Sequence, residues 1–236
     1  MRAKEPIALY PLDGAHGTKE VNDRVAAGVP SNVYLAPGPA GNVDGSHEFR
    51  GTANSYIEFP NGGGLDVPNS MTMLCWVFPS GRDGPLFNYR ASGSWGVHLW
   101  IVNRFQLFVR FTKRDYSFTN ALLHTALKPE EGWKFVGASY DQASGDAKLL
   151  VDGVEVQSLN IGANIQLATQ DSVRMGVKGG DARYFRGRIA QMQIYNTVLT
   201  SEQIMALKDR TQLAGKIAIN SFNLSLWTQP CVAIQI

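Results

Sequence analysis

The sequence has few cysteines, little net charge and no long apolar run, and each shortage excludes a class of protein. Two cysteines in 236 residues are too few for a disulfide scaffold. The net charge is +2, and no dense Lys/Arg stripe of the kind that binds nucleic acid is present. No apolar run is long enough to span a membrane. We therefore expect neither a nucleic-acid partner nor a membrane span.

The N-terminus lacks a signal peptide, because the segment Met1–Lys4 leads straight into a strand-like run. Either the protein is cytosolic or its natural chain does not start at Met1. We favour the second interpretation and expect an extracellular, secreted protein. The glycosylation sequon Asn223-Leu224-Ser225 agrees with that setting.

The two cysteines, Cys75 and Cys231, allow two interpretations. Buried free thiols are common in protein cores. Alternatively, a single disulfide could pin the C-terminal segment to the body of the protein, provided that the two Cα atoms lie within about 7 Å of each other.

Catalytic motifs are also missing. Retaining glycoside hydrolysis needs two carboxylates about 5 Å apart, and no alternating Glu/Asp arrangement on one strand supplies them. No phosphate loop or nucleophile motif occurs. The histidines show no metal-ligand spacing: His16, His47, His98 and His124. We expect a protein that is not an enzyme.

What the sequence does have is a series of short β-branched and aromatic runs separated by turn residues, including 24 glycines and 11 prolines. This spacing predicts an all-β, two-sheet antiparallel jelly-roll sandwich formed by one domain over residues 1–236. The predicted strands are Ile7–Leu12, Ser46–Arg50, Tyr56–Phe59, Met71–Phe78, Pro85–Tyr89, Trp95–Ile101, Phe105–Phe111, Trp133–Tyr140, Ala147–Val151, Val154–Leu159, Val173–Val177 and Phe185–Tyr195.

One hairpin can be registered from its pattern. A three-residue loop, Val102–Arg104, keeps the apolar residues of both strands on one face, whereas a two-residue turn would oppose apolar to polar residues. Asn103 suits a left-handed position in that loop. The predicted pairs are Ile101 with Phe105, Leu99 with Leu107, Val97 with Val109 and Trp95 with Phe111.

The opposite face of this hairpin mixes aromatic and hydrogen-bonding side chains: His98, Trp100, Gln106, Phe108 and Arg110. It is either a ligand platform or a sheet face covered by loops. We take Trp100, His98, Gln106 and Arg110 as the candidate ligand-binding residues. The platform hypothesis requires that Trp100 be exposed.

Two further local elements are predicted. The dipeptide Asp152-Gly153 indicates a tight hairpin turn that pairs Val151 with Val154 and Leu149 with Val156. A single short helix starts at a capping box formed by Thr200 and Gln203, with Leu199 packed on Ile204, and runs to about Arg210.

Four stretches in this order resemble the laminin-G-like and pentraxin-like branch of the concanavalin-A-like fold. They cover roughly residues 7 to 210 and are Ala8–Gly14, Glu48–Val77 with its three strand-like runs, Gly132–Gly153, and Tyr184–Leu199 with the helix that follows. The tail, Thr211–Ile236, lies beyond the resemblance, and its alternating apolar residues suggest one or two closing strands.

The resemblance implies a jelly roll that binds glycans, glycosaminoglycans or protein partners, often with calcium. It places a calcium ligand at Asp13 and an acidic pair at positions where this chain has Ala190 and Gln191, which weakens such a site. Calcium takes six to eight oxygen ligands. A second, thinner candidate is the loop Asp141–Asp146, which offers two carboxylates and an amide.

Two functions follow as hypotheses. The first is a non-catalytic, extracellular module that recognises glycans, with or without calcium. The second is a protein-interaction or adhesion domain of a larger secreted or receptor protein. Homo-oligomerisation through sheet edges, as in pentraxin-like domains, is a further possibility.

Overall fold

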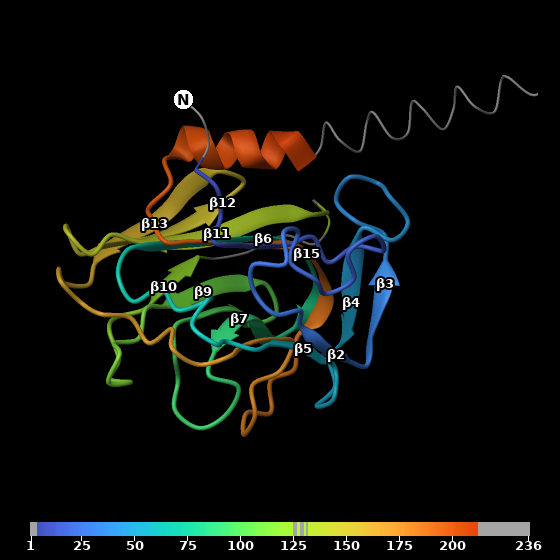
Figure 1. Cartoon of the computed structure of the whole chain (residues 1–236), viewed down its shortest axis with the longest axis horizontal. Helices are drawn as coiled ribbons and strands as arrows, with labels where there is room; N and C mark the ends of the chain where they lie inside the picture. Colours follow the sequence, from blue (N-terminus) through green and yellow to red (C-terminus); the bar gives the residue numbers. More distant parts are fainter. Residues whose placement is uncertain (1–3, 125–126, 128–129, 131, 212–236) are drawn as a thin grey trace, which may run out of the picture.

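The protein is a sandwich of two antiparallel sheets, with a helix on the outside of one of them (Figure 1). The computed structural model describes residues 4–124, 127, 130 and 132–211. This architecture confirms the predicted all-β, two-sheet fold with one short helix near the C-terminal end of the described chain.

Sheet A, the upper layer in Figure 1, has the strand order β13-β12-β11-β6-β15-β4-β3, with β1 paired to β15. All its neighbouring strands are antiparallel. The strands are β1 (Ala8–Tyr10), β3 (Val33–Ala36), β4 (Ser46–Arg50), β6 (Met71–Arg82), β11 (Lys134–Tyr140), β12 (Asp146–Val151), β13 (Val154–Asn160) and β15 (Arg186–Tyr195).

Sheet B, the lower layer, has the order β10-β9-β8-β7-β14-β5-β2. Its strands are β2 (Val29–Ser31), β5 (Tyr56–Phe59), β7 (Gly84–Tyr89), β8 (His98–Val102), β9 (Gln106–Arg110), β10 (Leu122–His124) and β14 (Val173–Met175). Each predicted run overlaps one strand, whereas the short strands β2, β3 and β10 have no counterpart in the prediction.

Strand β6 shows why parts of sheet A read as continuous apolar runs. Met73 and Cys75 belong to the core between the sheets, whereas Leu74 and Trp76 belong to a second buried cluster on the outer face. Helix 201–211 covers that outer face through Ile204. A strand buried on both faces needs apolar residues at every position, and each large side chain so buried stabilises the fold by about 1.5–3 kcal/mol.

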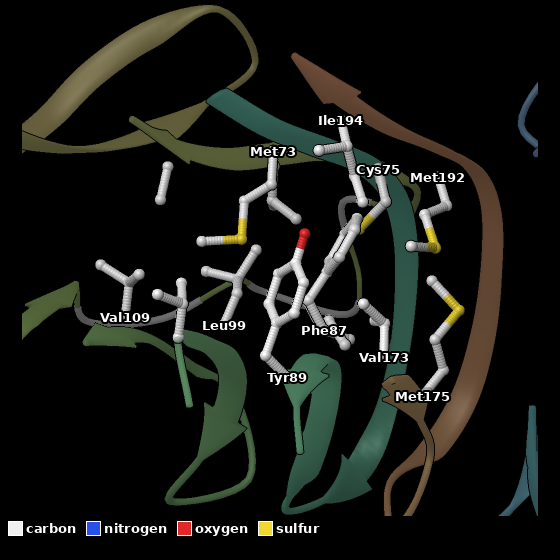
Figure 2. Packing of buried hydrophobic residues seen from close by; sticks show 14 of the residues in the cluster. Met73, Cys75, Phe87, Tyr89, Leu99, Val109, Val173, Met175, Met192 and Ile194 are labelled. Atoms are coloured by element: carbon white, nitrogen blue, oxygen red, sulfur yellow. The ribbon is translucent and has the colours of Figure 1, made fainter. Parts of the chain in front are cut away.

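The main core fills the space between the two sheets (Figure 2). Met73, Cys75 and Ile194 from sheet A face Tyr89 and other apolar side chains of sheet B. Cys75 has no exposed surface and forms no disulfide with a described residue, and burial raises the pKa of its thiol. Its proposed partner Cys231 lies outside the described residues.

The β8–β9 hairpin keeps the predicted faces and loop length but not the predicted pairs. Leu99 pairs with Val109, and the three-residue loop is 103–105. This two-residue displacement leaves the side chains of β8 and β9 on their predicted faces, because side chains alternate with a period of two. Alternation therefore could not distinguish these two registers. Asn103 has the predicted positive φ, 47°.

The β12–β13 hairpin follows the prediction next to its turn and departs from it further on. Asp152 and Gly153 both have positive φ, and Val151 pairs with Val154. A β-bulge then shifts the register, so Leu149 lies opposite Gln157 and the predicted pair Leu149–Val156 is wrong. A bulge inserts one extra residue into a strand, and the alternation of apolar and polar residues does not predict where this happens.

The capping box of helix 201–211 is confirmed. The Gln203 N–H donates to Thr200 Oγ1 at 3.3 Å, and the Thr200 N–H donates to Gln203 Oε1 at 2.9 Å. Leu199 and Ile204 lie in one buried cluster, as predicted. The predicted closing strands and the sequon Asn223 fall in residues 212–236, outside the described part of the chain, and stay predictions.

Candidate functional site

The outer face of sheet B carries a group of aromatic and cationic side chains. Leu99 of β8 and Val109 of β9 point into the core. Because side chains alternate along a strand, their neighbours on either side in the same strand must point outward. The register places His98 opposite Arg110 and Trp100 opposite Phe108. Strand alternation alone thus brings these four side chains together.

Loops complete this face as a pocket of about 250 Å³, which we call the aromatic pocket. Trp95 comes from the segment before β8, Phe118 from the segment after β9, and Arg183 from the segment before β15. The segments before β8 and before β15 are the green and orange loops below sheet B in Figure 1. The pocket is lined by Trp95, His98, Trp100, Val102, Phe108, Arg110, Phe118 and Arg183.

The rings of the pocket pack on one another. The Trp95 ring centroid lies 4.9 Å from that of His98 and 5.1 Å from that of Trp100. His98 stacks on Phe108 at 5.7 Å with an interplanar angle of 22°. The Arg183 guanidinium lies 4.6 Å from the Trp100 ring centroid. These contacts fix the shape of the pocket before any ligand arrives.

The expectation of an exposed platform is wrong. Trp100 is 1% exposed and His98 is 3% exposed, because Trp95 and Arg183 cover them. Trp100 and His98 therefore form the floor of a pocket, and Phe118, which is 54% exposed, offers an accessible ring at its rim.

Three of the four predicted ligand residues, His98, Trp100 and Arg110, line the aromatic pocket. Gln106 does not, and its Oε1 instead accepts a hydrogen bond from Asn103 Nδ2 at 2.6 Å beside the hairpin loop.

Four lining residues were missed by the sequence prediction: Trp95, Val102, Phe118 and Arg183. Trp95 was assigned to the core face by extending the alternation of β8, but β8 starts at His98 and the Trp95 ring packs with the outer rings. Phe118 and Arg183 lie in loops, where no periodicity predicts their direction. Arg183 is also distant in sequence from the hairpin that it covers.

Hydrogen bonds hold the floor in place. Trp100 Nε1–H donates to Asn88 Oδ1 at 3.0 Å, and His98 Nδ1 lies 2.7 Å from the Gly96 carbonyl oxygen. Since a carbonyl can only accept, Nδ1 of His98 carries the proton and Nε2 of the neutral ring is an acceptor. Burial first, and then nearby cations including Arg110, lower the pKa of His98 to about 4. His98 is therefore neutral at pH 7.

The predicted metal ligand Asp13 lies in a turn. Its Oδ1 accepts hydrogen bonds from the backbone N–H groups of Ala15 and His16, at 3.1 and 2.9 Å, and contacts the His16 ring. In the part of the chain that the structure describes, no group of three or more His, Cys, Asp or Glu side chains could hold a metal ion. Calcium held with the help of backbone carbonyls stays a prediction.

The other positions considered for calcium also have structural roles. Gln191 has a φ of 51° at an irregularity in β15, and its N–H donates to the Pro11 carbonyl. In the loop 141–146, Asp141 Oδ1 accepts from the Ala143 N–H, and Asp146 Oδ1 accepts from Asn160 Nδ2. These carboxylates shape turns.

Comparison with known families agrees with the two-sheet fold. Residues 50–205 match a laminin-G family described as the concanavalin A-like lectin/glucanases superfamily. The chain belongs to this superfamily. The match includes every residue that lines the aromatic pocket and ends inside helix 201–211. No curated protein matches this chain in sequence.

Solved structures with the same fold include two toxin domains. The binding domain of Paraclostridial Mosquitocidal Protein 1 aligns with a TM-score of 0.70 at 14% identity, over 86% of this chain and 51% of that one. The ligand-binding domain of botulinum neurotoxin serotype D, in complex with N-acetylneuraminic acid, gives 0.66 at 14% identity, over 87% and 50%. This superfamily member thus spans about half the length of those chains.

A third structure matches over almost its whole length. Domain 4 of an extracellular arabinanase from Geobacillus stearothermophilus, in complex with arabinotriose, aligns with a TM-score of 0.66 at 18% identity. The alignment covers 87% of this chain and 99% of that domain. At these identities the likeness establishes the fold, and function must be argued from the site.

Proposed function

We propose that this chain is a non-catalytic, extracellular module that binds glycans in the aromatic pocket. The observation that carries the proposal is the pocket itself. It is a preformed hollow on the outer face of sheet B, floored by packed rings and bordered by hydrogen-bonding groups of Arg110, Arg183 and His98. Small-molecule sites have this combination of apolar walls and a few fixed polar groups.

The chemistry of the pocket suits a sugar. A pyranose ring presents a face of C–H groups, which packs on aromatic rings, and an edge of hydroxyl groups, which need donors and acceptors. Phe118 and Trp95 supply rings at the mouth, and Arg110 supplies donors. Neutral His98 has no hydrogen-bond partner for Nε2 among the described residues, so it can accept from a hydroxyl.

The structural relatives support this proposal through the sugars in their complexes. One was solved with N-acetylneuraminic acid, and another, from an extracellular enzyme, with arabinotriose. We carry glycan binding and the extracellular setting over to this chain as a proposal. No helix within the described residues is both long and apolar enough to cross a membrane.

Binding without catalysis is favoured by the composition of the pocket. Glycoside hydrolysis uses two carboxyl groups beside the scissile bond. The residues that line the pocket include no aspartate or glutamate. Asp181, which lies nearby, is held by Arg183 in a two-point contact of 2.7 and 2.9 Å, and that contact holds the pKa of the Asp181 carboxyl below its usual range.

Replacing Phe118 with alanine tests the site. We expect glycan binding to weaken about two- to tenfold, because one accessible stacking ring is lost, while the fold is unaffected since the side chain is 54% exposed. A glycan array first identifies a bound sugar, and isothermal titration calorimetry then compares the two proteins.

Tyr34→Ala is the matched control for Phe118→Ala. Tyr34 is 48% exposed and lies under the Arg50 guanidinium at 4.3 Å, as Phe118 lies under that of Arg110 at 4.6 Å. Tyr34 is on β3 of the other sheet, so we expect its variant to bind like the wild type. Equal affinity of the Phe118 variant and the wild type would argue against the pocket as the site.

Calcium assistance is a secondary proposal and has its own test. A ligand that binds only the folded state must stabilise it, so calcium bound at Asp13 raises the melting temperature, and Asp13→Asn removes the rise. Asp13 Oδ2 makes no hydrogen bond within the described residues, which leaves this oxygen available to a cation. An unchanged melt at millimolar calcium would remove this proposal without affecting the aromatic pocket.

A second candidate function, protein interaction or adhesion, rests on a different surface. The sheet-edge strands β2 and β3 expose Val29, Tyr34 and Leu35 by 59%, 48% and 45%. Exposed sheet edges with apolar side chains pair readily with other chains. On this hypothesis Tyr34→Ala, and not Phe118→Ala, weakens the interaction, and light scattering would detect self-association through the same edges.

A further inference from the structure

We infer that the sugar bound by this chain is acidic, carrying a carboxylate or a sulfate group that contacts Arg110. This inference rests on the proposed function and narrows it to a class of ligand. Its starting point is an excess of buried or half-buried cations around the aromatic pocket that have no acidic partner in the described part of the chain.

Arg110 is the first of these cations. Its Nε is buried and has no hydrogen-bond partner, and its guanidinium forms no ion pair with a described residue. It packs only on rings, 5.5 Å from the Phe108 centroid and 4.6 Å from that of Phe118. Burial lowers its pKa, but an arginine so placed remains charged. The pocket wall thus contains a positive charge and a row of N–H donors that the fold does not use.

Two more cations contact the same group of rings. Lys178 is 4% exposed, its Nζ lies 4.4 Å from the Trp95 centroid, and it donates to the Gly93 carbonyl at 2.8 Å without an ion pair to a described residue. Arg183 is neutralised by Asp181. The other nearby carboxylate, Asp83, accepts two backbone N–H bonds of the hairpin loop. The lining remains positive after these pairings.

A buried charge without a partner is costly, and an opposite charge with directed hydrogen bonds offsets the cost. A guanidinium group can donate two parallel hydrogen bonds to a pair of oxygens of a carboxylate or a sulfate, and such charge-assisted bonds are about twice as strong as neutral ones. An uncharged hydroxyl would satisfy one donor of Arg110 but leave its charge uncompensated. The pocket therefore favours an acidic sugar over a neutral sugar of the same shape.

The test compares D-glucose, D-glucuronate and D-glucose 6-sulfate, which share one ring and differ at the outermost carbon. Ligand-observed and protein-observed NMR titrations with the full chain measure all three affinities. We expect one or both acidic sugars to bind about tenfold to a hundredfold more tightly than glucose. Which acid binds better distinguishes a carboxylate from a sulfate ligand.

Arg110→Gln should bring the ratio of acid affinity to glucose affinity close to one, and it should also weaken glucose binding because Arg110 supplies hydrogen-bond donors. The control is Arg50→Gln, which removes the same charge from an exposed arginine that also lies over an aromatic ring, that of Tyr34. We expect the Arg50 variant to keep the preference for acids. Because Arg110 is half-buried, the melting temperature of its variant is measured first, and titrations are run where it is folded.

Each outcome decides a different statement. Acid preference that is lost in Arg110→Gln and kept in Arg50→Gln supports the inference. Equal affinity for glucose and both acids overturns the inference and leaves glycan binding intact. A preference that both variants lose equally reflects net charge and also overturns it. If none of the sugars binds, and a glycan array with neutral and acidic glycans is also negative, the proposed function itself fails.

Discussion

Replacing Trp100 with alanine is expected to lower the free energy of unfolding by about 3–5 kcal/mol, because the ring is 1% exposed and its removal leaves a cavity. The loss has a second component. Trp100 Nε1 donates to Asn88 Oδ1, a buried acceptor that would then lack this donor. Urea denaturation followed by circular dichroism measures the difference, and an unchanged m-value shows that the unfolded state is the same.

Phe118→Ala serves as the comparison for Trp100→Ala, since both remove a ring from the aromatic pocket. The exposed ring of Phe118 should cost less than about 1 kcal/mol. A loss below about 1 kcal/mol for Trp100→Ala would contradict the buried floor. The large expected loss also means that Trp100→Ala is a poor binding test, because weak binding would then reflect unfolding.

Acidification from pH 7 to pH 4 is expected to destabilise the protein by about 3 kcal/mol through His98 alone. The pKa of this ring is about 4 in the folded protein and about 6.5 when unfolded. Between these values the unfolded chain binds a proton that the folded chain does not. Stability from this group is therefore fully present above pH 6.5 and is lost as the pH falls towards 4.

The variant His98→Gln isolates this contribution, because glutamine does not titrate. Free energies of unfolding are measured for both proteins from pH 7 to pH 4. The stability advantage of the wild type over the variant should shrink by about 3 kcal/mol over that range. His16→Gln, at an exposed turn next to Asp13, controls for the loss of one histidine. A stability advantage that stays constant with pH would contradict this account, because it would mean that the pKa of His98 is the same in the folded and unfolded protein.

The sequence predicted those parts of the fold that local chemistry decides. The run Met71–Phe78 predicts a strand because both faces of the strand are covered, so nearly all of its residues are apolar. The capping box at Thr200 and the turn at Asp152-Gly153 depend on neighbouring residues, and both are present. The faces of β8 and β9 follow from alternation, which is why the sequence alone could group His98, Trp100 and Arg110.

The remaining features depend on contacts between distant segments. The two-residue displacement of the β8–β9 register changes no face, so the pattern could not detect it. The short strands β2 and β3 form only because they pair with other strands, β2 with β5 and β3 with β4. Trp95 and Arg183 lie in loops and cover Trp100 and His98, so this face forms a pocket and not the expected exposed platform. Gln191 adopts its positive φ at an irregularity of β15 that the sequence does not signal.

The most direct test of glycan binding in the aromatic pocket follows the indole N–H signals of the tryptophans in a ¹H–¹⁵N NMR titration with D-glucuronate. Trp95 lines the aromatic pocket, whereas Trp133 packs on Phe78 on the outer side of the other sheet, with Arg188 over its ring at 5.4 Å. We predict a saturable shift of the Trp95 signal and no shift for Trp133. A shift confined to Trp133 would contradict the placement of the site, and the absence of any indole shift at a D-glucuronate concentration that saturates binding would contradict binding in the aromatic pocket.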